Sequence, residues 1–144
     1  MNVRSRHTGN RKAFTLVELA VVVVIIGVLA AFGVPRLLKS IERTKAAEAF
    51  AYLQSIRSGL ERYQARTGAY SSVLADLDVQ LPAPKYFTVG VIGPGSTGDI
   101  EDSWSLTLTR TGTAAGYGAY TVTFTDQGFD GANSTIVAEI NPQG

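Results

Sequence analysis

One acidic residue, Glu18, lies inside an apolar run that extends from Phe14 to Val34 and is otherwise interrupted only by Thr15. A run of about 20 apolar residues is long enough to cross a bilayer as a helix. A carboxylate is costly there, by roughly 2.5–3.5 kcal/mol at the bilayer centre and less near an interface. The sequence therefore predicts a membrane-spanning helix over residues 14–35 whose acid needs a polar or charged partner.

A second group of oxygen-bearing side chains, Asp126, Asp130 and Asn133, lies in one short connection. Ca²⁺ prefers several oxygen ligands from a flexible loop, so these three residues are candidate metal ligands. However, Gly128 occupies a ligand position of an EF-hand-like string, and no Glu follows at the required distance. Asp and Asn also supply the turn chemistry of a hairpin. We favour a hairpin turn and no cofactor, and calcium remains the alternative.

Composition argues against several kinds of chemistry. The chain has no Cys, and its single His is His7, so residues 14–144 lack the groups for Ser-His or Cys-His catalysis and for most transition-metal sites. Four positive charges lie in the first 13 residues, which leaves residues 14–144 with a net charge of −3. No basic surface for nucleic acid is evident. We therefore expect a protein that is not an enzyme.

The apolar run continues into an amphipathic pattern. Apolar residues recur at spacings of three and four, which lays one stripe along a helix. The stripe consists of Ala49, Leu53, Ile56, Leu60 and Tyr63. Gly68 is suited to cap the helix at its C-terminal end. One helix is thus predicted from Phe14 to about Thr67.

Four later segments have the composition of β-strands. Residues 86–92 are rich in aromatic and β-branched types, and residues 104–109, 120–125 and 136–140 contain alternating apolar positions. Alternation between Gly-rich connections predicts an antiparallel sheet of about 3–4 strands with one buried face. That face would cover the helical stripe and make a two-layer α+β head, with Trp104 in its core.

The segment Lys12-Ala13-Phe14-Thr15-Leu16-Val17-Glu18-Leu19 resembles the class III signal of type IV prepilins and type II secretion pseudopilins. The resemblance implies that a prepilin peptidase cuts between Ala13 and Phe14 and methylates the new amine of Phe14. Glu18 would become the fifth residue of the mature chain, where the family carries its acid. Pro35 falls where the first helix of the family usually bends. Ala13 departs from the family, which normally has Gly before the cut. A looser resemblance covers residues 63–77.

The resemblance also implies a pilin-like division of the chain. Residues 1–13 would be a cytoplasmic leader that is removed, residues 14–35 the transmembrane and filament-core half of the helix, and residues 36–144 the amphipathic half with the β-sheet head. An uncleaved signal anchor fits the hydropathy equally well, with the N-terminus also in the cytoplasm. It leaves Glu18 and Pro35 without a role, so we favour the prepilin interpretation.

The function that the resemblance implies is mechanical. The chain would be a structural subunit of a type IV pilus-like filament, drawn from the inner membrane by an assembly platform and packed against identical subunits in place of lipid. It would end in a periplasmic or cell-surface filament. The alternative is the major pseudopilin of a type II protein secretion system. A more distant alternative is a membrane-tethered binding domain.

Overall fold

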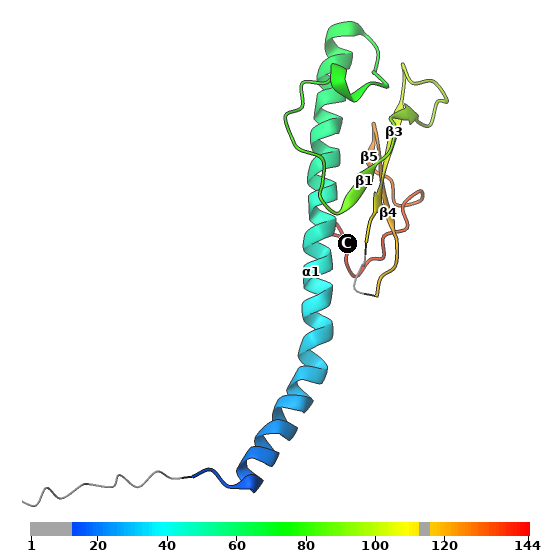
Figure 1. Cartoon of the computed structure of the whole chain (residues 1–144). Helices are drawn as coiled ribbons and strands as arrows, with labels where there is room; N and C mark the ends of the chain where they lie inside the picture. The colour runs from blue at the N-terminus through cyan, green and yellow to red at the C-terminus, as the bar shows by residue number, and fades with distance from the viewer. Residues whose placement is uncertain (1–12, 113–115) are drawn as a thin grey trace, which may run out of the picture. The chain divides into compact units, whose positions relative to one another are not determined.

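The computed structural model describes residues 13–112 and 116–144. They fall into two compact units, one ending at Arg36 and the other running from Leu37 to Gly144. The first unit holds the N-terminal part of helix α1, and the second holds the remainder of α1 and all of the strands (Figure 1). Of the predicted leader, only Ala13 lies within the described residues.

Helix α1 spans Leu16–Thr67 and contains Pro35. It begins two residues after Phe14 because Thr15 caps it: the Thr15 hydroxyl accepts a hydrogen bond from the Glu18 backbone N–H at 3.2 Å. At the other end Gly68 adopts a φ of 88°, and its N–H donates to the Gln64 carbonyl at 2.7 Å. The left-handed conformation favours glycine, so the predicted cap is confirmed.

The second unit contains one antiparallel sheet of five strands. The strands are β1 (Phe87–Val89), β2 (Gly93–Pro94), β3 (Trp104–Arg110), β4 (Thr121–Thr125) and β5 (Gly128–Phe129). Their order is β1-β3-β4-β5, and β2 also pairs with β3. The predicted three to four strands become five because β2 and β5, of two residues each, arise in segments predicted as loops. A short 3₁₀ helix, Leu74–Asp76, lies between α1 and the sheet in sequence.

One strand prediction was wrong. Residues 136–140 form no strand, because the Val137 carbonyl accepts hydrogen bonds from the N–H groups of Ile140 and Asn141, both at 3.2 Å, and closes a turn. Ile140 is nevertheless fully buried and Ile136 packs against the core. The apolar spacing of this segment indicates that its side chains are buried, and it does not indicate an extended backbone.

The core lies between the head half of α1 and one face of the sheet, as predicted. Ala49, Leu53, Ile56 and Leu60 of the predicted stripe are buried, and Tyr63 is half-buried. The facing side of the sheet is equally apolar and buried; it consists of Trp104, Leu106, Leu108, Val122 and Phe124. The unit is therefore the two-layer α+β head that the sequence predicted.

The opposite face of the sheet carries the threonines of β3 and β4. The hydroxyls of Thr107 and Thr123 lie 2.8 Å apart. The N–H groups of Asp130 and Thr135 donate to the carbonyls of Thr123 and Thr121, at 2.9 and 3.1 Å. Residues 130–135 thus lie beside β4; the Thr123 hydroxyl donates to the Asn133 carbonyl at 3.0 Å, and Thr123 is only 3% exposed.

Candidate assembly site

The first unit presents an apolar helix that no other described residue covers. Every described residue from 13 to 36 is exposed, and Phe14 and Leu16 are 76% and 84% exposed. Helix α1 is long and apolar enough to cross a membrane, judged by length and composition. A helix that is apolar all round is normally covered by lipid or by other helices. This exposed apolar surface is therefore suited to contact lipid or other helices.

Glu18 has a local role in the first turn of this helix. Its Oε2 accepts hydrogen bonds from the Thr15 N–H and the Thr15 hydroxyl, each at 3.0 Å, while the Thr15 hydroxyl accepts from the Glu18 N–H. Thr15 and Glu18 thus form a reciprocal capping box, which satisfies N–H groups that the helix itself leaves free. The carboxylate also lies at the positive end of the helix dipole. The predicted acid is therefore held at the very start of the helix.

The other predicted residues of this region lie on either side of that turn. Ala13 and Phe14 precede the helix and are exposed. Pro35 lies inside α1, one residue before the last residue of the first unit. Proline lacks an N–H, so the Ala31 carbonyl loses its usual helical donor at this point. Cleavage, methylation and the bend at Pro35 stay predictions.

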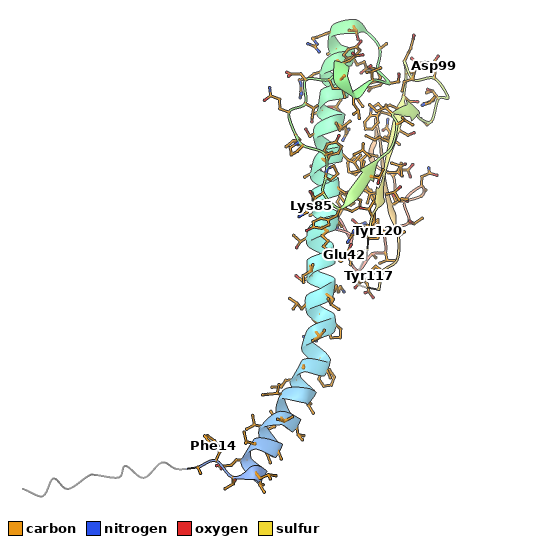
Figure 2. All side chains as sticks on the ribbon, viewed as in Figure 1. Phe14, Glu42, Lys85, Asp99, Tyr117 and Tyr120 are labelled. Carbon is orange, nitrogen blue, oxygen red and sulfur yellow. The ribbon has the colours of Figure 1, made fainter. Side chains whose placement is uncertain are left out.

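A buried ionic network in the head was not foreseen from the sequence. Glu42 of α1 is fully buried, and Arg110, the last residue of β3, is 3% exposed. Arg110 Nε donates to Glu42 Oε1 at 2.5 Å, and Nη2 donates to Oε2 at 3.1 Å. The Tyr120 hydroxyl donates to Oε1 at 3.0 Å, and Lys45 Nζ lies 3.5 Å from Oε2. Figure 2 shows Glu42 and Tyr120 where the helix and sheet meet.

Further groups lie around the Arg110 guanidinium. Its Nη1 donates to the carbonyls of Tyr86, at 3.3 Å, and of Thr111. The guanidinium carbon also lies 5.5 Å from the centroid of the Tyr86 ring, in cation–π range. A buried charge is tolerated only when it is paired and hydrogen-bonded in this way. The network joins the helix to both central strands of the sheet.

The network has a defined protonation state. Burial by itself raises the pKa of Glu42, but hydrogen bonds from Arg110 and Tyr120 and the charges of Arg110 and Lys45 outweigh it, so the pKa lies below its usual value. The hydrogen bond to Glu42 raises the pKa of Arg110. Burial, and then the bond to Glu42, raises the pKa of Tyr120. At neutral pH the network is thus a carboxylate, a guanidinium and a neutral phenol.

A sequence signal for this pair exists. Glu42 lies seven residues before Ala49, so it extends the apolar stripe of the helix by two turns. Arg110 lies two residues after Leu108, so it extends the inward-facing alternation of β3. Each stands at a position that its own pattern assigns to the core. Each break in an apolar pattern indicates a buried charge that needs a partner, and the two charges are of opposite sign.

The predicted calcium candidates are not gathered into one cluster of carboxylates. Among the described residues, no group of three or more acidic or other metal-binding side chains is present. Asp130 Oδ1 accepts from the N–H groups of Ala132 and Asn133, and Oδ2 accepts from the Asn133 amide at 2.7 Å. The Asn133 bonds lower the pKa of Asp130. Asp126 instead accepts from the Gln127 amide. Asp130 thus has the geometry of turn chemistry.

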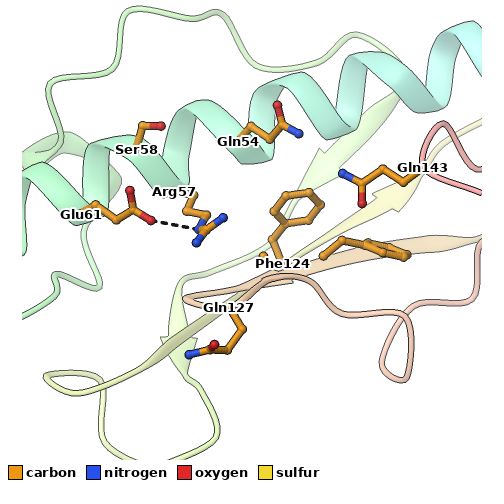
Figure 3. A pocket seen from close by; sticks show the side chains of 9 residues that line it. Gln54, Arg57, Ser58, Glu61, Phe124, Gln127 and Gln143 are labelled. Atoms are coloured by element: carbon orange, nitrogen blue, oxygen red, sulfur yellow. Dashed lines mark ion pairs between the residues drawn. The ribbon is translucent and has the colours of Figure 1, made fainter.

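A pocket of about 500 Å³ lies between α1 and the β4–β5 hairpin (Figure 3). Its helical wall carries an ion pair between Arg57 and Glu61, whose Nε and Oε1 atoms are 3.0 Å apart. The hairpin contributes Phe124 and Phe129. Amide side chains make up much of the remaining lining: Gln54, Gln127 and Gln143. These groups can bind a polar ligand, and among the described contacts no hydrogen bond joins the Ser58 hydroxyl of the lining to Glu61.

Comparison with known proteins identifies the N-terminal segment. Residues 8–34 match the family model described as the prokaryotic N-terminal methylation motif. The type II secretion system core protein G of Pseudomonas aeruginosa is 34% identical over 74 residues, which is 51% of this chain and 52% of that protein. The type IV wide pilus major component PilA4 of Thermus thermophilus is 40% identical over 68 residues, 47% and 52% of the two chains.

A longer match extends into the head. The fimbrial protein EcpC of Eikenella corrodens is 28% identical over 125 residues, 86% of this chain and 80% of that protein. In the matches with the core protein G of Pseudomonas aeruginosa and of Escherichia coli, the chain spans about half of each relative, 52% and 54%. The motif, the exposed apolar helix and the α+β head agree with one another. This chain carries the N-terminal methylation motif of prepilins and is homologous to type IV pilins and to type II secretion pseudopilins.

Proposed function

We propose that this chain is a structural subunit of a type IV pilus-like filament. It is made as an inner-membrane precursor with its N-terminus in the cytoplasm, and a prepilin peptidase cuts it between Ala13 and Phe14 and methylates Phe14. The observation that carries the proposal is the fully exposed apolar part of α1, with the Glu18 capping box, on a chain whose second unit is a compact head. The methylation motif and the pilin relatives support it.

The partners in this proposal are identical subunits. The apolar part of α1 leaves lipid and packs against the same helix of its neighbours as the assembly platform adds subunits. Lipid is as apolar as leucine, so dispersion and close approach favour this exchange. Gly27 and Gly33 suit that approach, because a Cβ added at either would meet no atom of the described residues within 4 Å. These positions are open to another helix.

We further propose that the chain catalyses no reaction. Its relatives are named as pilus and secretion-system components. The described pocket offers amides and an ion pair, and residues 14–144 contain neither His nor Cys. The proposed role is mechanical, and no cofactor is needed for it.

A second candidate function is the major pseudopilin of a type II secretion system, a periplasmic filament. It is favoured by the matches to core protein G in several bacteria, including Vibrio cholerae at 34% identity over 71 residues. The two functions predict different products. Electron microscopy of material sheared from the cell surface, with the chain identified by mass spectrometry, tests them. Surface filaments that contain this chain support the pilus. Their absence, together with loss of secreted proteins when the chain is deleted, supports the pseudopilin.

Calcium binding would bear on the same choice. We expect no calcium response, because the Asp130 carboxylate is already bonded within its own turn. A bound ion stabilises by about 2.7 kcal/mol at a hundredfold excess over Kd, so chelation of a bound ion would lower Tm measurably. The test is the Tm of the full chain in micelles, with and without chelator, for wild type and Asp130→Ala. A chelator effect that Asp130→Ala abolishes would contradict our expectation.

A further inference from the structure

The interface between α1 and the sheet contains one water-shielded polar link. The buried core beside it is apolar, and dispersion contacts have no preferred direction. Two other hydrogen bonds between α1 and later segments of the head are exposed: the Lys85 N–H donates to Glu48, and Arg62 donates to the Asp78 carbonyl. The Glu42–Arg110 pair is buried on both sides. Force applied along the helix would therefore stretch directional hydrogen bonds at the Glu42–Arg110 pair.

The position of the network places it on the path that force would take. Glu42 is the first buried residue of α1, and every described residue before it is exposed. Arg110 ends the seven-residue strand β3, and Tyr120 directly precedes β4. These two strands are the inner strands of the sheet. Tension that enters through the sheet and leaves through the N-terminal part of α1 loads the interface between α1 and the sheet, and Glu42 is the first buried residue of α1 in that interface.

We propose that Glu42, Arg110 and Tyr120 form a mechanical clamp that transmits tension from the sheet to helix α1. The clamp consists of two bonds from Arg110 and one from Tyr120 to a single carboxylate, at 2.5, 3.1 and 3.0 Å. Burial keeps water from replacing these bonds as they stretch, and a low-dielectric surrounding strengthens them. This role rests on the proposed filament function, because only an assembled filament puts tension on the head.

A clamp differs from a merely stabilising contact in a measurable way. Replacing a buried ion pair by apolar residues of similar volume is often neutral or stabilising at equilibrium. Forced unfolding instead follows the unfolding rate, which depends on the bonds broken at the barrier. The pair Glu42→Met with Arg110→Met should therefore leave the urea midpoint unchanged or raised, yet weaken the head when it is pulled across the clamp.

The experiment is single-molecule force spectroscopy on the full chain in micelles. The chain has no Cys, so attachment points can be introduced one at a time. Ser40→Cys with Thr109→Cys, both exposed, pulls β3 away from the helix beside the clamp. Arg66→Cys with Asp99→Cys, also exposed, loads the part of the head where Figure 2 shows Asp99, well away from Glu42. The second pair is the matched control for direction.

We expect the double Met variant to unfold about tenfold faster than wild type at one fixed force across Ser40 and Thr109, and at an unchanged rate across Arg66 and Asp99. Tenfold corresponds to about 1.4 kcal/mol of barrier. Tyr120→Phe removes one hydrogen bond and keeps the ring, so it should raise the unfolding rate across Ser40 and Thr109 by a smaller factor. This variant provides the test if the double Met variant fails to fold. Equal rates across Ser40 and Thr109, or equal changes in both geometries, would overturn the clamp. Because single chains are pulled, failure here leaves the filament proposal standing, and absence of filaments leaves this result standing.

Discussion

At the scale of single residues, Glu42 is the residue whose environment was least predictable from the sequence. Its neighbours along the helix place it on the buried face, yet its charge suggests solvent. The outcome depends on Arg110, which is 68 residues away in the chain. Pairing over that separation is set by the strand register, which no local pattern specifies. The sequence shows that a charged residue interrupts each apolar pattern, but it does not show that Glu42 and Arg110 pair with each other.

The stability of the head should depend on pH through Glu42. Its folded pKa lies below the ordinary value of about 4.3, so its contribution is fully present above that value and is lost as pH falls through the folded pKa. Urea unfolding of the full chain in micelles between pH 7 and 2.5 measures this. Glu42→Gln should be less stable at pH 7 and should lose less stability on acidification. Parallel pH profiles for the two proteins would contradict the assignment.

Removing one member of the pair should cost more than removing both. Glu42→Ala leaves the Arg110 guanidinium buried without its carboxylate, which destabilises by about 3–5 kcal/mol in comparable cases. Thr44→Ala serves as a control, since Thr44 is exposed on the same helix and its hydroxyl bonds only the Ser40 carbonyl among the described contacts. Urea denaturation at pH 7 checks both. A loss below about 1 kcal/mol for Glu42→Ala would show that the network contributes little.

Glu18 can act as a helix cap, as a charge, or as both. The structure shows the cap, and we propose that in the filament the carboxylate also binds the methylated amine of Phe14 of a neighbouring subunit. Glu18→Gln retains an acceptor suited to a capping box and removes the charge. Glu18→Leu removes both and makes the segment more apolar. We expect both variants to insert and to be cleaved, and both to form few or no filaments. Normal filaments from Glu18→Gln would assign the role to the cap.

At the scale of elements, the sequence predicted helix α1 and its cap because their signals are local. Spacings of three and four residues and a terminal Gly depend only on neighbours within a turn or two. The strands were less predictable. β2 and β5 have two residues each and exist because β3 and β4 lie beside them, while residues 136–140 alternate without a partner strand. Strand identity depends on pairing, which is a tertiary property.

Gly59 shows how a helix position can be fixed by a distant loop. A Cβ added there would lie 2.6 Å from Val79 Cγ2, so the loop after the 3₁₀ helix packs directly on the helix backbone. Alanine favours helix over glycine by about 1 kcal/mol, but overpacking costs about 1–3 kcal/mol, and valine has little freedom to turn away. Gly59→Ala should therefore destabilise the head by about 1 kcal/mol.

The same change should become favourable once the loop side chain is shortened. In a Val79→Ala background the Cβ contact is gone, so Gly59→Ala should stabilise by up to about 1 kcal/mol. Urea denaturation of the four proteins of this cycle gives the coupling energy directly. Additive effects would mean that the loop moves aside without cost and that the close packing at Gly59 has no energetic weight.

At the scale of the whole molecule, the filament role was predicted from the resemblance of residues 12–19 to the prepilin signal. A membrane-length apolar run lies directly after a basic stretch, which agrees with that resemblance. The neighbouring subunits cannot be read from the sequence, since filament contacts belong to an assembly and not to one chain. The choice between pilus and pseudopilus depends on those contacts.

The measurement that tests the central claim most directly is the intact mass of this chain taken from assembled filaments, with fragmentation of its N-terminus. We expect a chain of 131 residues that begins at Phe14 and carries one methyl group on its amine, without the four Arg and Lys residues of positions 1–13. Ala13 replaced by a bulky residue should leave the precursor in the membrane and out of filaments. Filaments whose subunits retain residues 1–13, or begin at any other residue, would contradict the prepilin account.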